Sequence, residues 1–138
     1  MGLVNDKFRL AFETEDALDD TGYLLTFGSS AGKVALASSG DVLVGINLVD
    51  TVSPFTGSAE ANKMVAVLPL VDGMVVELKV ADANQAISYG APLCIDSAEA
   101  GKVDYRDGTN ETGAVIAYAL EAVDANSGGT VKAIIMKE

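Results

Sequence analysis

Several residue types that enzymes depend on are scarce in this chain of 138 residues. It has no histidine and one cysteine, Cys94, which excludes a Ser-His-Asp triad, a Cys-His pair, any histidine-ligated metal and an intramolecular disulfide. Cys94 lies between Leu93 and Ile95 in an expected strand, with no base beside it to activate the thiol. We therefore expect a small core residue there, no enzymatic activity and no cofactor.

Basic residues are also few. Nine lysines and arginines stand against 20 acids, the formal net charge is −11, and the arginines are Arg9 and Arg106. Proteins that bind nucleic acid or anionic membranes cluster Lys and Arg on one surface, whereas the lysines here are scattered. We expect neither kind of partner. The acidity favours solubility and mutual repulsion, which suits a protein displayed at high density.

Long apolar runs are missing too. No segment approaches the ~20 consecutive apolar residues of a membrane-spanning helix, and the N-terminus lacks the apolar stretch of a secretory signal. We therefore expect a protein made in a cytoplasm-like compartment. A hydrophobic fraction of 49% still supplies the core of one compact domain.

Short apolar segments separated by turn signals predict an all-β domain. Residues 76–80, 33–36 and 102–105 alternate between apolar and polar, as half-buried strands do. Residues 64–70 and 134–136 are apolar on both faces, which indicates covered strands. Helical structure is limited to at most one turn at residues 82–86, where Asp82 is a suitable cap.

An internal repeat organises most of the chain. Residues 22–34 (GYLLTFGSSAGKV) match residues 90–103 (GAPLCIDSAEAGKV) at seven positions with one insertion. Each copy leads to a long apolar strand, at 42–49 and 114–122, and then to a final strand. This predicts a single β-barrel over residues 22–138 with an internal pseudo-twofold repeat. Its halves would be about 22–70 and 90–136, joined by a hairpin within 71–89.

Two segments look like ligand sites but have unsuitable spacing. Residues 28–34 (GSSAGKV) have three residues between the glycines where a phosphate loop has four, and Val34 replaces the required hydroxyl. The acidic loop with Asp104, Asp107, Asn110 and Glu111 does not follow the spacing of a calcium-binding loop. We interpret both as turns, the second as a solvated one, and expect no metal.

Residues 1–21 differ in character from the rest. Phe8, Leu10 and Phe12 share one face of an alternating segment, and the acids at 13–20 are typical of a solvated linker. One interpretation is an ordinary first strand. The other, which we favour, is an extended N-terminal arm that adds to a sheet edge of another molecule. The arm residues that would contact this partner are Lys7, Phe8, Arg9, Leu10 and Phe12.

A second candidate contact is the loop at residues 50–61. It is rich in Ser, Thr and Gly, yet it presents Val52, Pro54 and Phe55. Connections of this length in compact domains are usually functional or disordered. We expect the loop to contact another copy or a larger partner.

The order of these segments resembles the small capsid decoration (cement) proteins of tailed bacterial or archaeal viruses. The resemblance rests on the Gly-Lys-Val hairpins and on residues 44–49 (VGINLV), 87–93 (ISYGAPL), 114–122 (AVIAYALEA) and 131–136. It implies a β-barrel or β-tulip core with an N-terminal arm, usually as a homotrimer. The implied role is to bind the outer surface of the virion and bridge subunits of the major capsid protein.

Two other functions stay open from the residues alone. A structural protein of a viral tail or tube would share the acidic, β-rich composition. A barrel that binds a small ligand would need a cavity lined by convergent polar groups.

Overall fold

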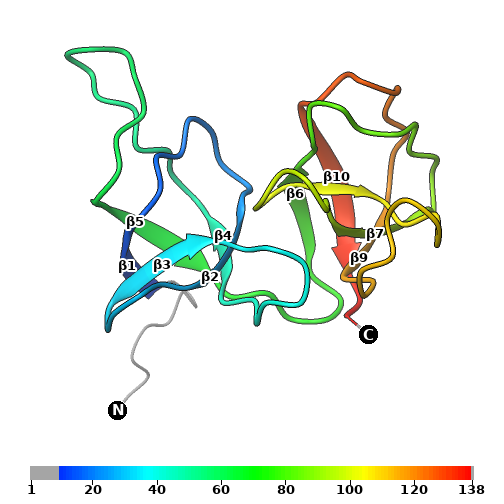
Figure 1. The fold of residues 1–138 in the computed structure, drawn as a ribbon, viewed down its shortest axis with the longest axis horizontal. Helices are drawn as coiled ribbons and strands as arrows, with labels where there is room; N and C mark the ends of the chain where they lie inside the picture. The colour runs from blue at the N-terminus through cyan, green and yellow to red at the C-terminus, as the bar shows by residue number, and fades with distance from the viewer. Residues whose placement is uncertain (1–9, 138) are drawn as a thin grey trace.

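The structure, a computed structural model, describes residues 10–137. It confirms the all-β class: within these residues all regular elements are strands, arranged in two five-stranded sheets that lie side by side (Figure 1). The strands are β1 (Leu10–Thr14), β2 (Leu24–Phe27), β3 (Lys33–Leu36), β4 (Gly45–Asn47), β5 (Lys63–Leu68), β6 (Val75–Lys79), β7 (Pro92–Ile95), β8 (Val103–Tyr105), β9 (Ala117–Ala119) and β10 (Thr130–Ile135). Among the described residues, no helix is long and apolar enough to cross a membrane.

The first sheet, which we call barrel 1, is closed in the order β1-β3-β2-β4-β5. β1 is antiparallel to β5 and parallel to β3, and the parallel pairing of Thr14 with Val34 closes the barrel. Alternating residues of these strands point inward. Buried side chains fill the interior, namely Leu18, Tyr23, Leu25, Val34, Val65 and Val67. A filled interior is typical of small barrels without an internal ligand.

The second sheet, which we call sheet 2, repeats this arrangement strand for strand. Its order is β6-β10-β9-β7-β8. When β6 to β10 are matched in chain order with β1 to β5, this is the order β1-β5-β4-β2-β3, which is the order around the closed barrel 1. A parallel bridge between Val80 and Val103 joins the end of β6 to β8. The same hydrogen bond follows in both copies, from Glu15 N to Val34 O (2.8 Å) and from Ala81 N to Val103 O (3.0 Å).

The expected repeat is therefore present, but its boundaries differ from those the sequence indicates. Each copy begins one strand earlier and forms its own sheet, where we expected two halves of one shared barrel. Residues 75–79 are the first strand of sheet 2 and not a connecting hairpin. β1 (LAFET) and β6 (VVELK) have no identical residue at matching positions, so comparison of the copies by identity misses this pair.

Besides the cluster inside barrel 1, a second hydrophobic cluster spans both sheets. Leu24 and Ile46 of barrel 1 belong to the same buried cluster as Leu78 and Val103 of sheet 2. Backbone groups also meet directly, because Gly101 N donates to Ala37 O (2.7 Å) while Gly101 O accepts from Leu24 N (2.8 Å). The sheets are thus packed together as one body.

Candidate functional site

The N-terminal segment is in part a strand of its own barrel. Leu10 pairs with Val67 and Phe12 with Val65 across β1 and β5, and Phe12 packs against the buried core of barrel 1. Leu10 and Phe12 therefore belong to a strand of their own barrel, in which Phe12 packs on the core while Leu10 keeps 36% of its surface exposed. A contact of either residue with a partner stays a prediction. Lys7, Phe8 and Arg9 lie outside the described residues, so any arm is confined to the residues before Leu10.

The acidic run at residues 13–20 is not a solvated linker. The Glu15 carboxylate accepts hydrogen bonds from Ser29 N (2.7 Å) and from the Ser29 hydroxyl, and these bonds lower the pKa of Glu15. Asp16 Oδ2 accepts from Leu36 N at 2.9 Å. The carboxylates therefore hold the connection between β1 and β2 against the β2–β3 hairpin.

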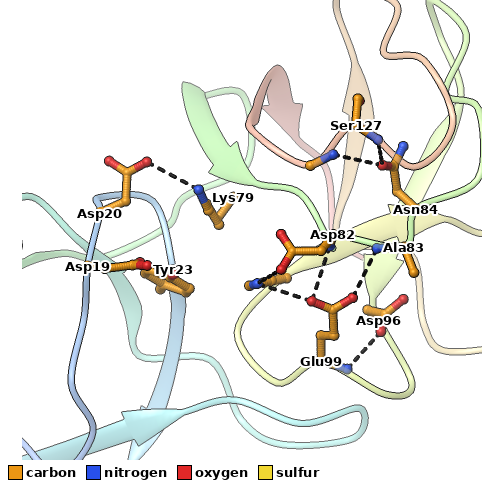
Figure 2. Close-up of polar contacts among 12 residues, drawn as sticks. Asp19, Asp20, Tyr23, Lys79, Asp82, Ala83, Asn84, Asp96, Glu99 and Ser127 are labelled. Carbon is orange, nitrogen blue, oxygen red and sulfur yellow. Dashed lines mark hydrogen bonds and ion pairs between the residues drawn. The ribbon is translucent and has the colours of Figure 1, made fainter. Parts of the chain in front are cut away.

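The end of this run reaches across to sheet 2 (Figure 2). Asp20 Oδ2 lies 3.3 Å from Lys79 Nζ, and the Tyr23 hydroxyl donates to Asp19. Burial, with the nearby Asp19 carboxylate, raises the pKa of Tyr23 above its usual range. A hydrogen bond from the backbone of Thr21, with smaller effects from Lys79, lowers the pKa of Asp20. The ion pair between Asp20 and Lys79 therefore ties barrel 1 to sheet 2.

The expected contact loop is an ordered hairpin that projects from barrel 1 between β4 and β5 (Figure 1). Val52 forms an antiparallel bridge with Ala59, and Gly57 N donates to Ser53 O at 2.8 Å. Phe55 lies at its tip with 95% of its surface exposed. Pro54 is also exposed and Val52 is half-buried. We call residues 51–60 the Phe55 hairpin.

An apolar groove lies where the two sheets meet. Val42 and Leu43 of barrel 1 form one wall, and residues 114–116 with Ile95 of sheet 2 form another. Its volume is about 290 Å³. We call it the junction groove. The sequence does not reveal it, because its walls come from loops in different copies of the repeat.

Three buried carboxylates form a cluster that sequence spacing does not predict. Oxygen atoms of Asp96, Asp104 and Glu111 lie within 4.8 Å of one another. Burial raises the pKa of Asp104, and the charges of Asp96 and Glu111 add to this rise. Each carboxylate accepts hydrogen bonds from nearby groups, namely Ser97 N and Oγ to Glu111, Ala98 N and Glu99 N to Asp96, and Gln85 N and Tyr105 N to Asp104.

The loop that supplies Glu111 combines an exposed turn with this cluster. Asp107 accepts hydrogen bonds from the backbone of Thr109, Asn110 and Glu111, which lower its pKa to about 2. This part of the loop is the turn that we expected. Asp104 and Glu111 differ from the expectation, since both are buried. Carboxylates are good Ca²⁺ ligands, but these already fasten the loop to the sheet, and we interpret the cluster as structural.

Two other sequence predictions are confirmed. Residues 28–34 form the turn of the β2–β3 hairpin, in which Lys33 N donates to Ser30 O at 3.2 Å and Gly32 has a φ of 80°. Cys94 is fully buried, and burial raises the pKa of its thiol to about 11. The thiol is therefore protonated at neutral pH and unsuited to nucleophilic chemistry.

Two known structures with a similar fold come from phage heads. No protein-family model matches the chain, and no curated protein matches its sequence. The head fiber gp8.5 N base of bacteriophage phi29 matches with a TM-score of 0.55 and 13% identity, over 93% of this chain and 92% of that one. The fold of this chain is similar to that of this head fiber base. A chain in the capsid of Myoviridae phage XM1 also has a TM-score of 0.55, with 20% identity over 90% of this chain and 81% of that one.

Both structures are parts of phage heads, and their likeness to this chain is a likeness of fold. Both match over nearly the whole chain, so the likeness covers barrel 1, sheet 2 and the junction between them. At identities of 13% and 20%, the likeness concerns the fold and transfers no individual contact residue.

Proposed function

We propose that this protein is a non-enzymatic structural component of a virus particle, which binds the outer surface of the capsid and bridges subunits of the major capsid protein. The observation that carries the proposal is the match of almost the entire chain to two phage head structures. A mechanical role agrees with a hydrophobic cluster that spans both sheets and with acids used to fasten loops. Assembly as a homotrimer is part of the proposal.

The N-terminal segment is the proposed capsid contact. Its Lys7, Phe8 and Arg9 would add to a sheet edge of a capsid subunit, where backbone bonds supply affinity and alternate side chains supply specificity. Leu10 and Phe12 anchor the segment, because both belong to β1 of the closed barrel. A load on the segment would thus pass directly into barrel 1. Several such contacts from one oligomer would bind far more tightly than one.

Co-sedimentation with undecorated capsids built from the major capsid protein of the same virus tests this proposal. The full chain is expected to sediment with the capsids, and a variant that lacks residues 2–9 is expected to stay in the supernatant. Tyr89→Ser is the control, since Tyr89 is an exposed aromatic residue in the connection between β6 and β7, and it should bind like the parent. Failure of the full chain to bind would overturn the function. Normal binding by the truncated chain would overturn the arm mechanism alone.

A further inference from the structure

We propose that copies of this protein associate head to tail, with Phe55 of one copy inserted into the junction groove of the next. The partner is a second copy of this chain. The contact forms in the free protein and does not depend on the capsid-binding role.

The Phe55 hairpin is ordered before any partner binds. Ser53 N donates to Ser58 O (2.9 Å) and Phe55 N donates to Ser53 Oγ (3.2 Å), in addition to the bridge at its base. Such order lowers the entropic cost of association. An aromatic side chain that is 95% exposed at the tip of an ordered hairpin has the character of the aromatic anchors that dominate protein interfaces.

The junction groove has a suitable size and lining for one side chain. Its volume of about 290 Å³ is at the lower end of the roughly 300–1,000 Å³ typical of small-molecule sites. Val42, Leu43, Ile95 and Ile116 give it apolar walls, and Val42 is largely exposed. Burial of Val42 and Phe55 against each other would remove two exposed apolar side chains from water.

Charge favours a second copy as the occupant. The net charge of −11 makes most approaches between copies repulsive. Residues 51–59 contain no charged side chain, and among the residues that line the groove the single acid, Asp41, is balanced by Lys137. The hairpin tip and the groove are therefore two locally neutral surfaces on an acidic protein, and copies can meet there without repulsion between like charges.

The two surfaces are different parts of the chain, so the contact is heterologous. The hairpin projects at the upper left of Figure 1, and the loop between β3 and β4 that carries Val42 lies at the lower centre. A pair of copies therefore retains one free tip and one free groove. Repetition of such a contact about a threefold axis closes a ring of three copies, and in this way the contact would build the proposed homotrimer; other rotations between neighbours give other rings or an open chain.

Sedimentation velocity of the free protein over a wide concentration range tests the proposal, at an ionic strength high enough to screen the net charge. The parent protein is expected to associate as concentration rises. Phe55→Ala removes the tip, and Val42→Asp or Ala114→Arg blocks the groove, so each variant should remain monomeric. Circular dichroism checks that each variant is folded. Tyr89→Ala is the control and should associate like the parent.

A mixture of two variants gives the sharpest result. Phe55→Ala keeps its groove and Val42→Asp keeps its tip, so the mixture is expected to form a one-to-one dimer and no larger species. A parent protein that stays monomeric throughout, or a Phe55→Ala variant that associates like the parent, would overturn the proposal. A mixture of folded variants that forms no dimer would also overturn it.

Discussion

Gly22 and Glu77 meet backbone to backbone where barrel 1 contacts sheet 2. A Cβ atom on Gly22 would lie 2.6 Å from the carbonyl oxygen of Glu77, and the φ of Gly22 is 86°. Gly90 occupies the equivalent position in the second copy of the repeat, with a φ of 84°. Among the described residues, apart from its two chain neighbours, no heavy atom lies within 4 Å of the corresponding Cβ position. The repeat thus keeps one backbone conformation at both glycines and uses only Gly22 for packing.

Substitution of Gly22 and Gly90 distinguishes the cost of backbone strain from the cost of a steric clash. Gly90→Ala should lower the free energy of unfolding by about 1–2 kcal/mol, the usual effect of a side chain in the left-handed region. Gly22→Ala adds a clash with a carbonyl group that cannot rotate away, so we expect a loss of about 3 kcal/mol or more. Urea denaturation followed by circular dichroism measures both. Equal losses would show that the close approach of the sheets at Gly22 does not stabilise the fold.

The buried acids predict an unusual pH dependence. The pKa of Asp104 is raised in the folded state, so its contribution to stability is present below its unfolded pKa and is lost as pH rises through the folded pKa. At neutral pH its charge therefore destabilises the fold. Asp104→Asn, whose amide oxygen can still accept the bonds from Gln85 N and Tyr105 N, should raise the thermal midpoint at pH 7. The gain should shrink as pH falls.

Asp107 serves as a control because its pKa is shifted in the opposite direction from that of Asp104. Its pKa is lowered to about 2 by backbone hydrogen bonds, so its contribution is present above the unfolded pKa and is lost as pH falls towards 2. Asp107→Asn should therefore lower the thermal midpoint at pH 7 and have little effect near pH 2. A gain from Asp104→Asn that is constant across this range would contradict the electrostatic explanation.

A buried amide holds the junction side of barrel 1. Asn47 Oδ1 accepts from Tyr23 N (2.8 Å), while Nδ2 donates to Asp20 O and Val49 O, each at 2.8 Å. Asn47→Ala leaves these backbone groups without their partner, and we expect a loss of about 3 kcal/mol in unfolding free energy. Asn110→Ala is the exposed control and should change it by less than about 0.5 kcal/mol. Similar denaturation midpoints for the two variants would show that this network contributes little.

Along the N-terminal segment, we expect Phe12 to contribute to stability and Phe8 to contribute to capsid binding. Phe12 is half-buried against the core of barrel 1, so Phe12→Ser should lower the free energy of unfolding by about 2 kcal/mol. Phe8→Ser should lower capsid occupancy instead. Urea denaturation and co-sedimentation of each variant measure the two effects. Loss of capsid binding without loss of stability in Phe12→Ser would restore the longer arm that the alternating sequence suggests.

The sequence predicts local features of this fold better than it predicts their assembly. The Gly-Lys-Val turns of the repeat lead directly into β3 and β8, because glycine conformation and alternation are properties of neighbouring residues. Alternation also places Leu10 and Phe12 on one face, but it does not tell whether that face meets its own barrel or a partner. In the structure Phe12 packs on the core of barrel 1 and Leu10 stays 36% exposed, and the pairing of β1 with β5 that places them there is not visible in the sequence.

For the candidate contacts, too, the sequence predicts local features better than features that depend on assembly of the fold. The exposed position of Phe55 could be predicted, since Pro, Gly, Ser and Thr surround it within one loop. The junction groove could not, because it joins residues that are distant in sequence. The carboxylate cluster could not either, because the pairing of β7 with β8 brings Asp96 near Asp104, and the loop at residues 106–113 then returns Glu111 to Ser97.

Electron cryo-microscopy of capsids mixed with saturating amounts of this protein tests the central claim most directly. The account predicts additional density of the size of this chain on the outer surface of the capsid, in contact with at least two major capsid subunits, and its loss when residues 2–9 are deleted. Capsids that carry no additional density, or density on the inner surface, would contradict it.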